Sequence, residues 1–402
     1  MSYEVSHPWI TFRLRLNNAS HDFWILAGEA KSKCEHIANV PLQPAVQKQL
    51  HAVYLVKGVR ATVAIEGNTL SEDQVHQRLE GTLTLPPSQE YLGTEIDNVI
   101  AAINQIGRQV ESGHAPILSV ELIKEYNQLV IKNLKLREGV IPGEIRKEPF
   151  GVAHYRGAPA AECQYLLERL CEWLNGPDFQ PQDGGEDKNL ITALIKAILA
   201  HLYLEWIHPF GDGNGRTGRL LEFLILASSG VPGPAAHLLS NHYNLTRTEY
   251  YRQLDLSSKS GRDVLPFLMY ALKGFVDGLR LQLGYIRGQQ WNLAWHSYIH
   301  EQFQNRTSPS DVRRRRLVHD LSKFNKRIPL NKLVEMTPRT ATAYATRKAR
   351  TLSRDLNVLL KMDLIEVSKE GCRAKKEKIL AFLPFRHDPV VKENEPVEKK
   401  SA

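Results

Sequence analysis

The segment HPFGDGNGRTGR at residues 208–219 gathers residue types that could bind a phosphate and act on it. Pro209 ends the helical pattern before it, and a second helical pattern begins near Asn214 or Gly215. A helix N-terminus presents unpaired N–H groups and a partial positive charge, and glycines let an anion approach the backbone. We therefore expect Gly213, Asn214 and Gly215 to form a phosphate cradle.

The charged residues of the same segment suit chemistry on phosphates. Arg216 and Arg219 are three residues apart, so they project from one face of the second helix and can grip successive phosphates. Asp212 precedes the cradle and is placed to hold Mg²⁺, which usually takes one or two carboxylates plus phosphate oxygens and water. His208 lies at the mouth, and an ordinary histidine pKa of about 6.5 suits a general base near neutral pH.

Two known phosphate-binding motifs fail to fit this segment. Gly213-x-Gly215-x-x-Gly218 matches the dinucleotide fingerprint, but that motif follows a strand, and here a helical pattern precedes it. The acid expected about 20 residues further on is absent, because no acidic residue lies between Glu222 and Glu249. A P-loop needs Lys followed by Ser or Thr after its last glycine. A plain surface turn explains the glycines but not the charged residues.

Helical patterns on both sides would position this segment. Apolar residues recur at three- and four-residue spacing before it (Ile191, Leu194, Ile195, Ile198, Leu199, Leu202) and after it (Leu220, Leu221, Phe223, Leu224, Leu226). The helical pattern extends from about residue 95 to 280. Within it, the segment GEIRKEPFGVAHYRGAP at 143–159 has the Gly and Pro punctuation of a hairpin or an irregular loop.

The pattern HxFxDGNGRxxR at 208–219 resembles the full signature of the Fic family, whose members mostly transfer AMP from ATP to a hydroxyl side chain of a target protein. The resemblance implies a mainly α fold, a Fic-type helical bundle with a small β-hairpin flap. It makes His208 the general base on the target hydroxyl and Asp212 the ligand of Mg²⁺. Asn214 and the cradle would bind the phosphates, and both arginines would hold the phosphate chain. Phe210 would point inward and anchor the loop.

The segment GVAHYRGAP at 151–159 resembles the flap through which the family binds its targets. The resemblance makes Val152, Ala153 and His154 the residues that pair with an extended target segment by strand addition. An ordinary surface hairpin stays open as the alternative.

A second motif, TVAIEGN at 62–68, resembles the family's inhibitory helix in the form that lies N-terminal in the same chain. Thr62 and Glu66 are four residues apart on one helical face, and the helix ends at Gly67. Glu66 could pair bidentately with Arg219 and occupy the guanidinium that the γ-phosphate needs. Such a pair is worth about 1.5–3 kcal/mol, so we expect an autoinhibited enzyme. Whether the same carboxylate also supports removal of AMP is left open.

The C-terminal region is strongly basic. Residues 311–380 contain 19 Lys and Arg against 8 Asp and Glu, a net charge of +11, which leaves the rest of the chain at −3. Two helical runs at 311–324 and 330–336, a third helix and two strands around Gly371 resemble a winged helix-turn-helix, common as an appendage in this family. Thr337 or Thr340 can cap the third helix, which would enter a DNA major groove with four cations, Arg347, Lys348, Arg350 and Arg354. DNA binding and protein contacts stay open as alternatives.

Together these patterns predict an N-terminal region with the inhibitory helix (1–94), a Fic catalytic domain (95–284), a winged helix-turn-helix domain (285–387) and a disordered tail (388–402). A composition of 42% hydrophobic and 24% charged residues is typical of globular proteins. We expect a cytoplasmic protein without a membrane partner, because no apolar run looks long enough to span a bilayer. Four cysteines without a CxxC pair (Cys34, Cys163, Cys171, Cys372) predict neither disulfides nor a zinc site.

The predicted function is a protein adenylyltransferase that uses ATP and Mg²⁺ and binds its target protein through the flap. The expected partners include double-stranded DNA, and a homodimer is left open. The alternative is a DNA-binding transcriptional regulator that uses the Fic site as a nucleotide sensor. His208 favours the enzyme, because a pocket that only binds a nucleotide needs no base beside the phosphate cradle.

Overall fold

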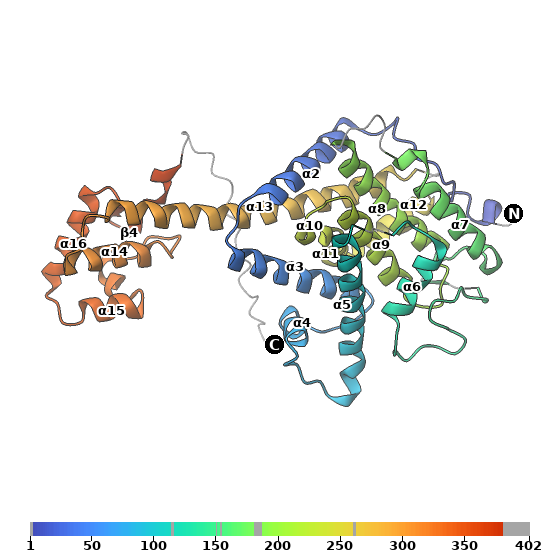
Figure 1. The fold of residues 1–402 in the computed structure, drawn as a ribbon, viewed down its shortest axis with the longest axis horizontal. Coiled ribbons are helices and arrows are strands. Elements are labelled where there is room, and N and C mark those ends of the chain that lie inside the picture. Colours follow the sequence, from blue (N-terminus) through green and yellow to red (C-terminus); the bar gives the residue numbers. More distant parts are fainter. Residues whose placement is uncertain are drawn as a thin grey trace. The chain divides into compact units, whose positions relative to one another are not determined.

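The computed structural model describes residues 3–113, 116–149, 151–152, 155–180, 187–259 and 263–380. The chain divides into two compact units, Met1–Ile286 and Arg287–Ala402 (Figure 1). Each unit has its own hydrophobic core.

The first unit is almost entirely helical. Its helices are α1 (Tyr3–Ser6), α2 (His21–Asn39), α3 (Pro44–Ala64), α4 (Glu72–Leu79), α5 (Glu90–Glu111), α6 (Val120–Val130), α7 (Cys163–Leu174), α8 (Asp187–Ile207), α9 (Asn214–Ser228), α10 (Gly233–Ala236), α11 (Leu238–Leu245), α12 (Arg247–Lys259) and the first part of α13 (Leu265–Gln302). Strands β1 (Gly151–Val152) and β2 (Tyr155–Arg156) pair antiparallel. Short 3₁₀ turns lie at Pro87–Gln89, Ala160–Glu162 and Pro177–Phe179.

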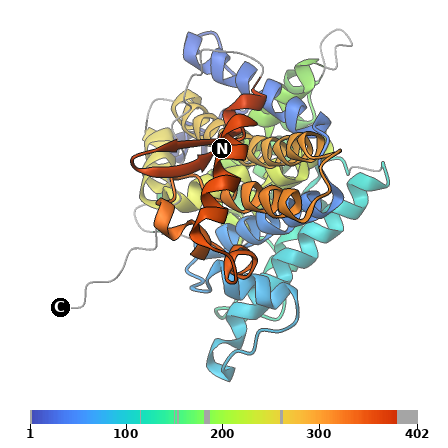
Figure 2. The same cartoon turned by 90° about the vertical axis from the view of Figure 1, so that its left-hand side faces the viewer.

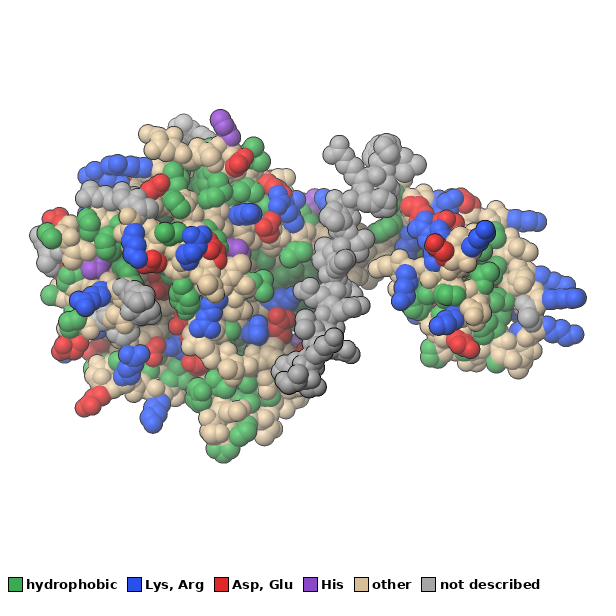
Figure 3. Space-filling view, turned by 180° about the vertical axis from the view of Figure 1, so that it is seen from behind, with side chains coloured by type: hydrophobic (Ala, Val, Ile, Leu, Met, Phe, Trp, Pro, Cys, Tyr) green, Lys and Arg blue, Asp and Glu red, His purple; other side chains and the backbone are tan. Residues whose placement is uncertain are grey.

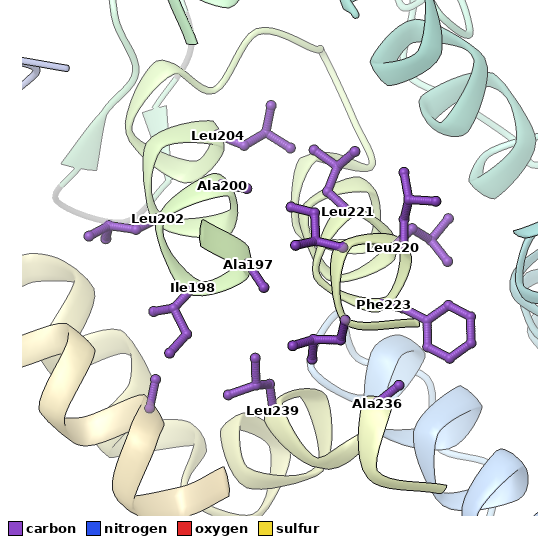
Figure 4. Close-up of a cluster of buried hydrophobic side chains, with 14 of the residues drawn as sticks. Ala197, Ile198, Ala200, Leu202, Leu204, Leu220, Leu221, Phe223, Ala236 and Leu239 are labelled. Carbon is purple, nitrogen blue, oxygen red and sulfur yellow. The ribbon is translucent and has the colours of Figure 1, made fainter. Parts of the chain in front are cut away.

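Helices α8 and α9 form the centre of this unit. In Figure 4, Leu204 of α8 and Leu221 of α9 point toward one another across their interface, and Leu239 of α11 lies at the other end of the cluster, below Ile198. Leu190–Ile207 is apolar and long enough to span a membrane by composition, yet 78% of this stretch is buried inside the protein. Its central position therefore accounts for a helix that is apolar all round.

Three further helices, α3, α5 and α6, pack against α9 and bring distant segments to its N-terminus. Side-chain caps set where several helices of this unit begin. Ser20 caps α2, Ser119 caps α6, and Ser71 caps α4 in a reciprocal capping box with Gln74. Each cap satisfies backbone N–H groups that the helix cannot bond itself, for about 1 kcal/mol.

The second unit combines helices with a β-hairpin (Figure 2). After α13 come α14 (Pro309–Leu321), a 3₁₀ helix (Leu330–Glu335), α15 (Pro338–Tyr344), α16 (Ala349–Lys361), β3 (Ile365–Ser368), β4 (Gly371–Ala374) and a 3₁₀ turn (Lys376–Ile379). The predicted strand pair is confirmed, with Ile365 opposite Ala374, and Ile328 adds a bridge to Cys372. Trp295, Leu317 and Leu359 lie in the core of this unit.

The prediction of one continuous third helix is wrong. A turn at 345–347 and an extended Lys348 separate α15 from α16, so that Arg347 and Lys348 precede α16. The break lets buried Asp355 of α16 accept hydrogen bonds from Tyr344 (2.9 Å) and Arg313 (2.7 Å). The segment at 330–336 also differs from expectation, since it is a 3₁₀ helix.

Replacing Leu359 with Ala tests the separate core of the second unit. Leu359 is fully buried and neighbouring Leu360 is 39% exposed. We expect Leu359→Ala to lower the free energy of unfolding by about 2–5 kcal/mol, because it leaves a cavity, and Leu360→Ala to change it by less than about 0.5 kcal/mol. Hydrogen exchange should show the loss of protection in peptides from 309–375, and equal effects of the two variants would contradict this core.

Candidate active site

The loop after α8 begins with a strained histidine. His208 precedes Pro209, which disfavours helical backbone, and its φ is +49°. Such a left-handed conformation costs a non-glycine residue about 1–2 kcal/mol. The His208 N–H donates to the Leu204 carbonyl (2.8 Å), and Arg146 Nε donates to the His208 carbonyl (2.8 Å). These bonds hold the imidazole-bearing residue at the end of α8.

Arg146 fastens this loop to the segment before the flap. Its buried guanidinium donates to three carbonyls, those of His208, Glu148 and Ala158, and its own backbone N–H donates to the Pro209 carbonyl (2.9 Å). Sequence reasoning missed this role, because nothing distinguishes Arg146 from the other charges in GEIRKEP.

Side chains of the loop itself fix the conformation of its middle, residues 210–214. Phe210 is 1% exposed, in agreement with an inward anchor. The Asn214 side chain accepts from the Phe210 N–H (2.9 Å) and donates to the Phe210 carbonyl (2.8 Å), so it shapes the loop. Gly213 has φ +78°, and α9 begins at Asn214, as the sequence predicted. Asn127 of α6, which was not predicted, donates to the Asp212 carbonyl (2.8 Å).

Glu66 reaches Arg219 from the turn that follows α3. Its Oε1 lies 2.5 Å from Nη2 of Arg219, and the same Nη2 donates to the Thr62 carbonyl (2.9 Å). This single hydrogen bond differs from the bidentate pair expected. The Thr62 hydroxyl bonds instead to the Gly58 carbonyl (2.9 Å) within α3. Burial raises the pKa of Glu66, but the Arg219 charge and hydrogen bond outweigh it and hold this pKa below its ordinary value.

The Glu66 carboxylate occupies the anion position at the start of α9. A Cβ atom at Gly215 would clash with Glu66 Oε1, so the carboxylate lies directly against the first turn of this helix. Unpaired N–H groups and the helix dipole attract anions there. The Arg219 side chain is 1% exposed, and its Nε and Nη1 have no hydrogen-bond partner within the described residues. These buried donors suit an anion with more oxygens than a carboxylate has.

The other arginine has separate partners. Arg216 contacts Asp212 Oδ1 (2.8 Å) and Glu95 Oε1 (3.1 Å), and Glu95 Oε2 accepts from Asn68 Nδ2 (2.8 Å). The segment 62–68 therefore touches both arginines, through Glu66 directly and through Asn68 by way of Glu95. Asn68 stands in the recognised motif, but Glu95 carries no sequence signal.

Asp212 is the residue that fits Mg²⁺. Its side chain is 41% exposed, and its Oδ1 accepts from the Gly213 N–H and from Arg216. Among the described residues, no group of three or more His, Cys, Asp and Glu could hold a metal ion. A single exposed carboxylate fits a Mg²⁺ ion that takes its remaining ligands from phosphate and water.

A short hairpin lies beside the site. Gly151 pairs with Arg156 and Val152 with Tyr155, whereas Ala153 and His154 fall outside the described residues. The Tyr155 hydroxyl donates to the Trp206 carbonyl (2.6 Å), which ties the hairpin to α8. Binding of a target segment here stays a prediction.

The sequence around this site is similar to the sequences of known Fic proteins. A sequence model of the Fic/DOC family matches residues 117–226, which include the loop after α8. The chain is 30% identical to the protein adenylyltransferase fic-1 of Caenorhabditis briggsae over 259 residues, 64% of this chain and 46% of that protein. It is 29% identical to the Caenorhabditis elegans protein of the same name over 249 residues, 62% and 45% respectively. The chain therefore matches slightly less than half the length of these relatives, whose names support a Fic-type transferase.

The fold is similar to those of solved Fic structures. A fragment of Fic-1 from C. elegans aligns with a TM-score of 0.54 at 24% identity, covering 66% of this chain and 73% of that one. A Fic family protein from Desulfovibrio desulfuricans aligns with a TM-score of 0.54 at 20% identity, covering 88% and 93%. The mainly helical architecture is thus shared with Fic proteins.

Two glycine variants test the tight packing of the cradle. Gly213 and Gly230 both have positive φ, +78° and +80°, but a Cβ at Gly213 would lie 2.7 Å from Ile131, whereas Gly230 has nothing within 4 Å. We expect Gly230→Ala to cost about 1–2 kcal/mol from backbone strain, and Gly213→Ala about 1–3 kcal/mol more from overpacking. Urea unfolding measures both, and equal costs would show that the loop does not press on α6.

Proposed function

We propose that this protein transfers AMP from ATP to a Tyr, Thr or Ser hydroxyl of a target protein, and that Glu66 holds this activity in check. The observation that carries the proposal is the Glu66 carboxylate at the anion position of α9, bonded to Arg219. An anion site built around a buried arginine, with a histidine at the end of the preceding helix, suits phosphoryl chemistry. The names of the sequence relatives support the same reaction.

The residues of the loop have distinct roles in this reaction. Burial and the charge of Arg146 lower the pKa of His208 to about 4, so the imidazole is neutral at pH 7 and can accept a proton. His208 takes the proton of the target hydroxyl as its oxygen bonds to the α-phosphorus. The bond from that phosphorus to the bridging oxygen breaks, and pyrophosphate leaves with the electron pair. Arg216, Arg219 and the N–H groups of the cradle balance the phosphate charge.

Asp212 would hold Mg²⁺ together with the phosphates in this proposal. The ion supplies further neutralisation of phosphate charge when it is bound. The chain's own part is to keep Asp212 at the mouth of the cradle, where the Gly213 N–H and Arg216 orient its carboxylate.

Inhibition follows from competition for one guanidinium. Glu66 and the γ-phosphate of ATP both need Arg219, so the nucleotide must displace the carboxylate before it can bind in a productive pose. A charge-assisted hydrogen bond of about 1.5–3 kcal/mol corresponds to a factor of about 10–100 in affinity. The resting enzyme is therefore expected to be slow.

Replacing Glu66 with Gly should raise the transfer of AMP by about 10–100-fold, because Arg219 becomes free for the phosphates. The measurement is labelling of protein by [α-³²P]ATP, with [γ-³²P]ATP as the control that separates AMP transfer from phosphorylation. The double variant with His208→Ala should show no labelling. Glu72→Gly, on exposed α4, is the matched control and should behave like wild type. Equal labelling of wild type and Glu66→Gly would rule out the inhibitory role.

We further propose that the second unit is a winged helix that binds duplex DNA. The supporting observation is the exposed side of α16, where Arg350, Arg354 and Lys361 take part in no ion pair within the described residues. The one acid of this helix, Asp355, is buried and held by Arg313 and Arg314. Figure 3 shows Lys and Arg side chains gathered on this unit. A helix of 13 residues whose exposed charges are all positive suits a polyanion.

A double charge reversal, Arg350→Glu with Arg354→Glu, tests this second role. We expect the full chain to shift a duplex of about 30 base pairs, and its affinity to fall about a hundredfold between about 50 and 200 mM salt if about four phosphates are contacted. The double variant should abolish the shift. Lys48→Glu with Lys273→Glu makes the same charge change on exposed residues of the first unit and should leave binding intact. Equal binding by both double variants, or a preference for RNA, would contradict the proposal.

A further inference from the structure

Glu205 is an acid in the last turn of α8 that the phosphate chemistry above does not use. Its side chain is 14% exposed, and its Oε1 is shielded from solvent without a hydrogen-bond partner within the described residues. Its Oε2 lies 3.7 Å from Nδ1 of His208, too far for a hydrogen bond but close enough for a strong interaction between charges. Burying a carboxyl oxygen without a hydrogen-bond partner destabilises the folded protein. A functional role beside the imidazole would explain why this residue is an acid.

Glu205 touches the imidazole in two ways. Its backbone carbonyl accepts a hydrogen bond from the ring, which raises the pKa of His208, and its carboxylate faces Nδ1. A proton held at Nδ1 leaves Nε2 as the atom that can accept a proton from a hydroxyl. At this distance the carboxylate can still stabilise the positive charge that the ring gains when it accepts a proton.

We propose that Glu205 is a positioning residue for His208: its carboxylate faces the Nδ1 side of the ring and, when ionised, stabilises the imidazolium that forms when the target hydroxyl loses its proton. This role rests on the proposed AMP transfer. The proton moves from the hydroxyl oxygen to Nε2, the hydroxyl oxygen bonds to phosphorus, and pyrophosphate departs. Glu205 itself gains and loses nothing in this step.

Charged and titratable groups from several elements face this pair. The groups that interact with Glu205 are Glu66, Arg219, Tyr155, Glu222 and Tyr250. Those that interact with His208 are Arg146, Glu66 and Asp212. Burial and the negative charge of Glu66 raise the pKa of Glu205 to about 7, while Arg219 lowers it. Glu205 therefore changes charge near neutral pH, and the basicity of His208 rises as the pH passes through this range.

A titration followed at His208 tests the proposal without any need for activity. In the full chain labelled with [¹³C]histidine, the Cε1–H resonance of His208, assigned by its loss in His208→Ala, should show a step near the pKa of Glu205, about 7. Glu205→Gln should remove this step. Glu66→Gln should move it to lower pH, because the charge that raises the pKa of Glu205 is gone. Glu72→Gln is the control, since it removes an exposed carboxylate in the first turn of α4 and should leave the step unchanged.

The rate of AMP transfer supplies a second readout. In the Glu66→Gly background, Glu205→Gln should lower kcat by about tenfold with little change in KM for ATP, equivalent to a change of about one unit in the pKa of the base. Glu205→Asp should restore part of the rate. A His208 resonance that titrates identically in wild type and in Glu205→Gln, with both proteins folded, would overturn the proposal. If no variant transfers AMP but the step depends on Glu205, the proposed function fails while the pairing of Glu205 with His208 stands.

Discussion

The buried guanidinium of Arg219 must have an anion beside it. Its side chain is 1% exposed, and a charge removed from water is tolerated only when an opposite charge and hydrogen bonds compensate for it. In this structure the compensation comes from Glu66 and from the Thr62 carbonyl. The same position, against the first turn of α9, is where a phosphate would bind. We propose that this position takes either the Glu66 carboxylate or a phosphate of a bound nucleotide.

The rest of the first unit keeps Glu66 and the start of α9 in place. Helices α8 and α9 form a packed centre, and α3 lies against α9 so that the turn at 65–67 meets the helix start. Between α8 and α9, the loop is fixed by Arg146 from outside and by Asn214 from within. A strained His208 persists because these bonds determine its backbone. In the proposed reaction, groups held in this way would need little reorganisation.

Residues that act within one contiguous segment could be predicted from the sequence, and residues that act across the fold could not. The order of helix, polar loop and helix around residues 208–219 follows from periodicity and from Pro209, and the structure shows it. Arg146, Glu95 and Glu205 reach the site through tertiary contacts, and each looks like an ordinary surface charge in the sequence.

The same limit explains the errors. The hydrogen bonds between the Asn214 side chain and the Phe210 backbone were not predicted, because the sequence does not show which loop atoms meet in the folded chain. The third helix of the second unit was predicted as continuous because residues 345–348 contain neither Gly nor Pro. The break is fixed instead by Asp355, whose partners lie on α14 and α15.

Calorimetric titration of ATP and of AMP, each into wild type and into Glu66→Gln, tests the competition for Arg219 most directly. The account predicts that the variant binds ATP about 10–100-fold more tightly, whereas its affinity for AMP changes by less than about twofold, because AMP has no γ-phosphate to compete with Glu66. An equal change for both nucleotides, or no change for either, would contradict it.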